Sequence, residues 1–132
     1  MGQKFLIDSN IIIEFLKGSL STNGMTLVAQ AINSTPYVSV VSKIEVLGFN
    51  APSNEEKLLK EFFKDAQVLP LSDQIVNKTI DLRKTHKRKL PDMIIAATAL
   101  IHQLDIISRN TKDFNNIAEL TVIDPHNFSI AN

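Results

Sequence analysis

The chain has 132 residues, 14 basic against 14 acidic side chains, and no cysteine. Its length is that of one domain with a hydrophobic core, so we expect residues 1–132 to form a single domain. Zero net charge excludes a basic protein that coats nucleic acid by bulk electrostatics, and the lack of cysteine excludes disulfide scaffolds, thiolate zinc sites and cysteine nucleophiles.

Short β-rich segments alternate with helical segments along the whole chain. The first apolar run, 4–8, predicts a strand that leads into a helix over 11–17, which Gly18 ends. The remaining expected elements are, in chain order, helix 21–33, strand 37–41, helix 42–49, helix 53–65, strand 67–71, helix 72–87, helix 91–103, strand 104–108 and strand 120–123. This alternation predicts an α/β fold in which helices cover both faces of a mainly parallel sheet.

Polar side chains stand where the predicted strands end. Asp8 ends the first strand, Glu45 follows the second, Asp92 opens helix 91–103, and the segment 110–113 follows strand 104–108. Parallel sheets gather their ligands at the carboxyl ends of the strands. We therefore expect these four positions to meet at one edge of the sheet.

Each position also has a purely structural interpretation. Asp8 could cap the helix that follows it, and Ser42 with Glu45 matches a capping box. Asp92 in a first helical turn is favoured by the helix dipole, and 110–113 could be an ordinary turn with Asx hydrogen bonds. No single acid decides between the two interpretations.

The combination of acids favours a metal site. Two carboxylates about 4 Å apart repel by about 4 kcal/mol at an effective dielectric constant near 20, so a cluster needs a neutralising cation. Oxygen ligands without histidine favour Mg²⁺ or Mn²⁺ over zinc. Such a site suits attack of water on a phosphodiester.

Four segments resemble the motifs of the PIN domain family: FLIDSNIII at 5–13, SKIEVLG at 42–48, DMIIAATA at 92–99 and SRNTKDF at 108–114. More narrowly, they resemble the VapC-type toxin ribonucleases of bacterial type II toxin-antitoxin pairs, from residue 5 to about residue 125. The resemblance implies a PIN-like three-layer α/β/α sandwich and a Mg²⁺-dependent endoribonuclease that hydrolyses RNA phosphodiester bonds. It also implies a homodimer and a cognate antitoxin protein.

The resemblance also implies roles for the acids. Asp8 and Asp92 match the acids that hold the metal directly, and Glu45 would hold it through water or orient the nucleophile. For the fourth position, Asp113 is the expected supplementary acid, also through water, with Asn110 as a polar neighbour; some relatives place an acid at the position of Asn110.

Neighbouring polar and basic side chains complete the predicted site. Ser9 and Asn10 are expected to steady the Asp8 carboxylate and bound water. Residues 1–77 hold 8 acidic and 6 basic side chains, whereas residues 78–132 hold 6 acidic and 8 basic. Basic side chains near the acids would let phosphate approach. The candidates for RNA contact are Arg83, Lys84, Lys87, Arg88, Lys89, Arg109 and Lys112.

Two observations limit that interpretation. The basic cluster could equally be a solvated helix C-terminus, where cations complement the dipole. Tyr37 is the only tyrosine and the seven phenylalanines mostly fall at core spacing, so no aromatic platform for base recognition is expected.

Two other function classes stay open. One is a catalytically inactive PIN-like module that binds protein; it is disfavoured because none of the first three acids is replaced. The other is a phosphoryl-transfer or receiver-type domain with Asp8 as nucleophile, which would need a second acid where Asn10 stands. The first apolar run is too short for a secretory signal and no stretch approaches the roughly 20 residues that span a bilayer, so we expect a cytoplasmic protein without membrane contact.

Overall fold

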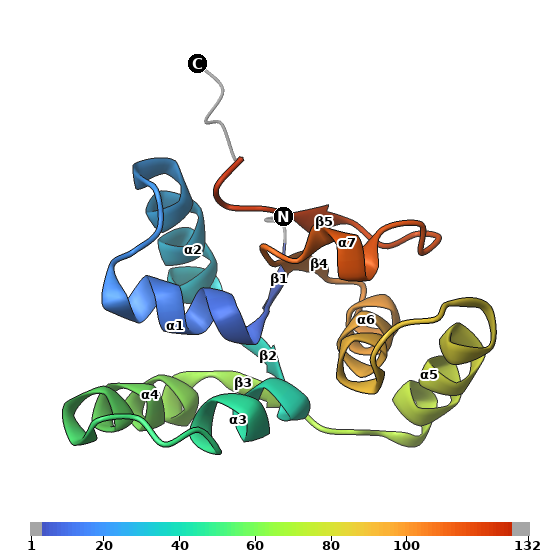
Figure 1. Ribbon diagram of the computed structural model, residues 1–132, viewed down its shortest axis with the longest axis horizontal. Coiled ribbons are helices and arrows are strands. Elements are labelled where there is room, and N and C mark those ends of the chain that lie inside the picture. The colour runs from blue at the N-terminus through green and yellow to red at the C-terminus, as the bar shows by residue number, and fades with distance from the viewer. Residues whose placement is uncertain (1–3, 128–132) are drawn as a thin grey trace.

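The fold is built around a five-stranded parallel sheet (Figure 1). The computed structural model describes residues 4–127. The strands are β1 (Phe5–Ile7), β2 (Tyr37–Ser39), β3 (Gln67–Leu69), β4 (Asp105–Ile107) and β5 (Val122–Ile123). Their order in the sheet is β3-β2-β1-β4-β5, so β1 lies at the centre and the chain crosses over it between β3 and β4.

Helices cover both faces of this sheet. They are α1 (Ser9–Lys17), α2 (Thr22–Ser34), α3 (Val40–Leu47), α4 (Ser53–Asp65), α5 (Asp73–Thr85), α6 (Leu90–His102) and α7 (Thr111–Phe114). The helices α1 to α4 pack against one face and α5 to α7 against the other (Figure 1). The predicted α/β/α sandwich with a parallel sheet is therefore confirmed.

The central strand supplies both cores because its side chains alternate between the two faces. Leu6 points into a core with Met93 of α6, and Ile7 points into the opposite core with Ile11 of α1 and Val28 of α2. All five side chains are fully buried. Because helices cover β1 on both faces, the carboxyl end of this strand is held in one place at the edge of the sheet.

The predicted elements are all present, with shorter strands, but the alternative interpretation of Ser42 and Glu45 as a capping box is wrong. Helix α3 begins at Val40, and its cap is Ser39, whose hydroxyl accepts a hydrogen bond from the Val41 amide at 3.1 Å. Ser42 is therefore buried inside the helix, and the Glu45 side chain is free of any capping role. The segment 110–113, for which an ordinary turn was the alternative interpretation, instead leads into the short helix α7 (Thr111–Phe114).

Within residues 4–127, no helix is both long and apolar enough to cross a bilayer.

Candidate active site

The register of the two central strands brings Asp8 and Ser108 together. Ile7 of β1 pairs with Ile107 of β4, so the next residue of each strand lies at the same edge of the sheet. The Asp8 amide donates to the Ile107 carbonyl at 3.0 Å, and the Ser108 hydroxyl donates to Asp8 Oδ2 at 2.7 Å. The Ser9 amide donates to Asp8 Oδ1 at 2.8 Å. Asp8 thus caps α1 and is held rigidly at 6% exposure.

Ser108 is a site residue that the sequence analysis did not assign. It is fully buried, and its hydroxyl also accepts a hydrogen bond from the Asn110 amide at 3.0 Å. It therefore links the first acid to the fourth position. The available signal was its place at the end of a predicted strand, at the edge of the sheet where Asp8 stands.

Three acids from three separate elements line one cavity of about 430 Å³: Asp8 after β1, Glu45 on α3 and Asp92 on α6. The Ser9 hydroxyl donates to Glu45 Oε1 at 2.9 Å. Ser9 therefore contacts Asp8 with its amide and Glu45 with its side chain, a broader role than the one predicted. Asn10 lines the same cavity.

The fourth position is divided between two side chains. Asn110 lines the cavity, just before α7 begins. Asp113 lies on α7, half-buried, and its charge raises the pKa of both Asp8 and Asp92. The sequence left these two residues as alternatives, and the fold brings both within reach of the first three acids.

The carboxyl groups perturb one another. The pKa of Asp92 is raised to about 6, first by burial and then by the charges of Asp113, Asp8 and Glu45, while the charge of Lys89 opposes the increase. Burial also raises the pKa of Asp8, and the hydrogen bonds from Ser108 and Ser9 partly offset it. The cavity therefore concentrates negative charge that the protein does not neutralise.

A divalent cation fits this cavity. The ligand atoms available are carboxylate, amide and hydroxyl oxygens, the set that Mg²⁺ and Mn²⁺ prefer. Among the described residues, no group of three or more His, Asp and Glu side chains is arranged to hold one ion directly. Mg²⁺ usually binds through one or two carboxylates and keeps several waters, so the arrangement suits a partly hydrated ion.

The predicted RNA contacts differ in their surroundings. Lys89 precedes α6 as its N-cap residue, and its charge lowers the pKa of Asp92, which places it beside the cavity. Four others are exposed to solvent and lie on α5, just after it, or on α7: Arg83, Lys84, Lys87 and Lys112.

The two remaining arginines are engaged within the protein. Arg88 Nη2 donates to the carbonyl of Asn115 at 3.3 Å and to its Oδ1 at 3.0 Å. Arg109 forms an ion pair with Glu14 of α1. Each contact uses one guanidinium nitrogen, and the Arg109 side chain is still 49% exposed.

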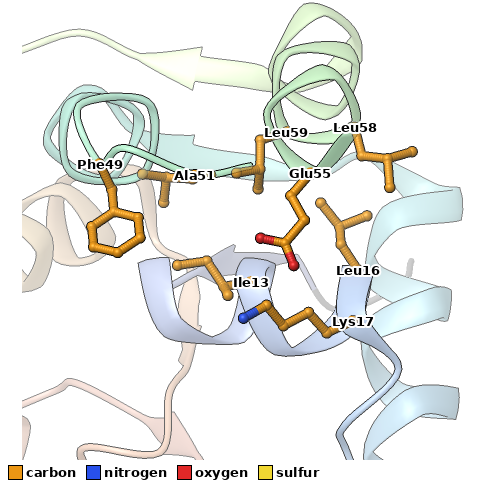
Figure 2. A pocket seen from close by; sticks show the side chains of 9 residues that line it. Ile13, Leu16, Lys17, Phe49, Ala51, Glu55, Leu58 and Leu59 are labelled. Atoms are coloured by element: carbon orange, nitrogen blue, oxygen red, sulfur yellow. The ribbon is translucent and has the colours of Figure 1, made fainter. Parts of the chain in front are cut away.

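An apolar groove adjoins the cavity (Figure 2). It lies between α1, α3 and α4, and we call it the α1/α3/α4 groove. It is lined by Ile13, Leu16, Lys17, Val46, Phe49, Ala51, Glu55, Leu58 and Leu59. Four of these, Ile13, Lys17, Val46 and Phe49, also line the acidic cavity, so the two depressions are continuous.

Comparison with known proteins matches residues 5–120 to the family model of the PIN domain. The chain is 30% identical over 130 residues to "Ribonuclease VapC1" of Rickettsia felis, covering 89% of this chain and 93% of that protein. Among solved structures, a toxin-antitoxin complex from Klebsiella pneumoniae has a TM-score of 0.72 and 30% identity, over 92% of this chain and 98% of the matched one. VapBC-1 from nontypeable Haemophilus influenzae has a TM-score of 0.76 and 22% identity, over 93% and 98%.

Proposed function

Because the chain belongs to the PIN domain family, we propose that it is a Mg²⁺-dependent endoribonuclease and the toxin of a toxin-antitoxin pair, acting in the cytoplasm. One observation supports the proposed nuclease activity. Asp8, Glu45 and Asp92 come from three distant parts of the chain and line one cavity. Local capping explains Asp8 but not the meeting of all three.

The chain's own groups have distinct tasks in this reaction. A bound Mg²⁺ ion would lower the pKa of its water and neutralise charge on the scissile phosphate. Asp8 and Asp92 would hold the ion, with Ser108 and the Ser9 amide fixing the Asp8 carboxylate. Glu45, oriented by the Ser9 hydroxyl, is the exposed carboxylate of the set and is suited to orient the attacking water.

The test is cleavage of an RNA pool by the purified protein with and without Mg²⁺. We expect cleavage with Mg²⁺, none in chelator, and none by Asp92→Asn with Mg²⁺. Asp81→Asn removes an exposed acid of α5 outside the cavity, and it should cleave like the parent. A folded parent that binds a protein partner but cleaves no RNA would instead support the inactive binding module.

The α1/α3/α4 groove is our proposed docking site for an apolar segment of the antitoxin. The solved relatives include toxin-antitoxin complexes. A segment seated on Leu16, Leu58 and Leu59 would extend over Ile13 and Val46 into the acidic cavity, because those residues line both depressions. Binding there would therefore block access of RNA to the acids.

The exposed face of α5 is our proposed homodimer contact. Asp73, Val76, Ile80 and Arg83 follow one another at helical spacing on that face, with the acid at one end and the base at the other. Antiparallel pairing about a two-fold axis would set Val76 opposite Ile80 and Asp73 opposite Arg83 in both directions. The face is thus complementary to itself.

Light scattering tests this contact. Ile80→Glu should halve the mass of the particle, whereas Ile44→Glu, at an exposed apolar position of α3, should leave it unchanged. A monomeric parent, or a dimeric Ile80→Glu variant, would contradict the proposed contact.

A further inference from the structure

Phe49 is exposed beside the acids. Among the large hydrophobic side chains of residues 4–127 it is the most exposed, at 69%. Figure 2 shows its ring at one end of the α1/α3/α4 groove, away from Leu16 and Leu58 at the other end. It also lines the acidic cavity. Most phenylalanines were expected in the core, and Phe49 is an exception that leaves its ring exposed beside the cavity.

The backbone places this ring one helical turn beyond Glu45. Gly48 ends α3 with near-helical torsion angles, φ −79° and ψ −7°, and the Phe49 amide still donates to the Val46 carbonyl at 3.4 Å. Residues four apart lie on the same side of a helix, with Cβ atoms about 5–6 Å apart. Glu45 and Phe49 also line the same cavity, so a carboxylate and an aromatic ring stand at one opening.

We propose that Phe49 stacks on the base of a nucleotide next to the scissile phosphate and thereby contributes to RNA binding at the acids. The inference rests on the proposed ribonuclease function. Unpaired bases stack readily on aromatic side chains, whereas a base inside a duplex is already covered on both faces. The phenylalanine side chain has no hydrogen-bonding group. The contact therefore distinguishes unpaired from paired bases more than it distinguishes one base from another.

The position of Phe49 favours RNA over a protein occupant for this ring. Leu16, Leu58 and Leu59 line the groove alone, whereas Phe49 is shared with the cavity that would hold the phosphate. Leu59 is also buried by the fold itself, at 7% exposure, while the Phe49 ring leaves most of its surface to solvent. An antitoxin segment in the groove would then compete with a base for the same ring.

The test measures kcat/KM on a single-stranded oligoribonucleotide that contains a bond cleaved by the parent. A matched series replaces each nucleotide near that bond, one at a time, by an abasic ribose. Base stacking on an aromatic side chain corresponds to roughly a tenfold effect or more. We expect Phe49→Leu to lose about tenfold on the intact RNA, mainly through KM, and Phe49→Tyr to retain activity. Removing the base at one position should lower kcat/KM of the parent about tenfold. The same abasic RNA should lower kcat/KM of Phe49→Leu no further.

Ile44→Ala serves as the control. It removes an exposed apolar side chain of α3 that lines neither the groove nor the cavity, and it should cleave like the parent. Equal activity of Phe49→Leu and the parent, or the same further loss at every abasic position, would overturn the stacking contact and leave Phe49 to a protein partner. A parent that cleaves no RNA in Mg²⁺ would instead overturn the proposed function.

Discussion

Asp8 and Asp92 face the same cavity, but the protein holds them in different ways. Asp8 is almost fully buried and accepts hydrogen bonds from the Ser108 hydroxyl and the Ser9 amide. Asp92 is half-buried in the first turn of α6, a helix without a side-chain cap, and only Lys89 counters the burial and acidic neighbours that raise its pKa. One carboxylate is fixed by the fold, and the other is left for a cation to stabilise.

The strongest test of this difference replaces each acid by alanine. Asp8→Ala and Asp92→Ala should both lower cleavage more than about 100-fold, because supporting groups alone are worth 10- to 100-fold and these acids are the proposed ligands. Their stabilities should differ. Urea denaturation in chelator should show a loss of about 1 kcal/mol for Asp8→Ala, which removes the cap of α1 and the acceptor of Ser108. Asp92→Ala should be at least as stable as the parent, and an equal loss in both variants would refute the comparison.

A weaker effect is expected at Ser108, which acts on the reaction only through Asp8. Ser108→Ala should lower kcat about tenfold, as loss of a group that orients a metal ligand usually does. Because its hydrogen bond lowers the pKa of Asp8, the variant's pH-rate profile should also move to higher pH. Ser108→Thr keeps the hydroxyl and should restore the profile. A lower kcat with an unmoved profile would assign Ser108 a packing role only.

The smallest expected effect is a change of the free energy of unfolding with pH, and Asp92 rather than Asp8 is the residue that it tests. The pKa of Asp92 is about 6 in the folded protein, well above its ordinary value of 3.8, so between these pH values the unfolded chain has released a proton that the folded protein retains. The free energy of unfolding without metal should therefore fall as pH rises from about 4 to about 6, on the order of 1 kcal/mol after solvent screening. Asp92→Asn should reduce this slope, and Mg²⁺ should oppose it by binding the ionised form. A metal-free parent that gains stability over this range would contradict the assignment.

Much of the fold and of the acidic cavity could be predicted because both follow from local patterns. The alternation of short apolar runs with helices specifies a parallel sheet, and Asp8 and Asp92 stand where such a sheet collects ligands. The choice between Ser39 and Ser42 as a helix cap could not be predicted. It depends on where β2 stops pairing with its neighbours, which only the assembled sheet decides.

The contacts that the sequence missed join residues far apart in the chain. Ser108 reaches Asp8 across 100 positions through the strand register, and Arg109 reaches Glu14 across 95. Phe49 was missed for another reason. Its apolar character predicts burial, but α3 ends at Leu47, two residues earlier, and the ring lies at the surface.

The strand order has a consequence for synthesis of the protein on the ribosome. The chain lays down β1, β2 and β3 on one side before it returns to place β4 against the other edge of β1. A nascent chain that ends after β3 contains Asp8 and Glu45 but lacks Asp92 and Ser108. Because domains are made from the N-terminus onward, the acidic cavity cannot be completed until most of the chain has been translated. The topology therefore makes assembly of the acidic cavity one of the last steps in the synthesis of the domain.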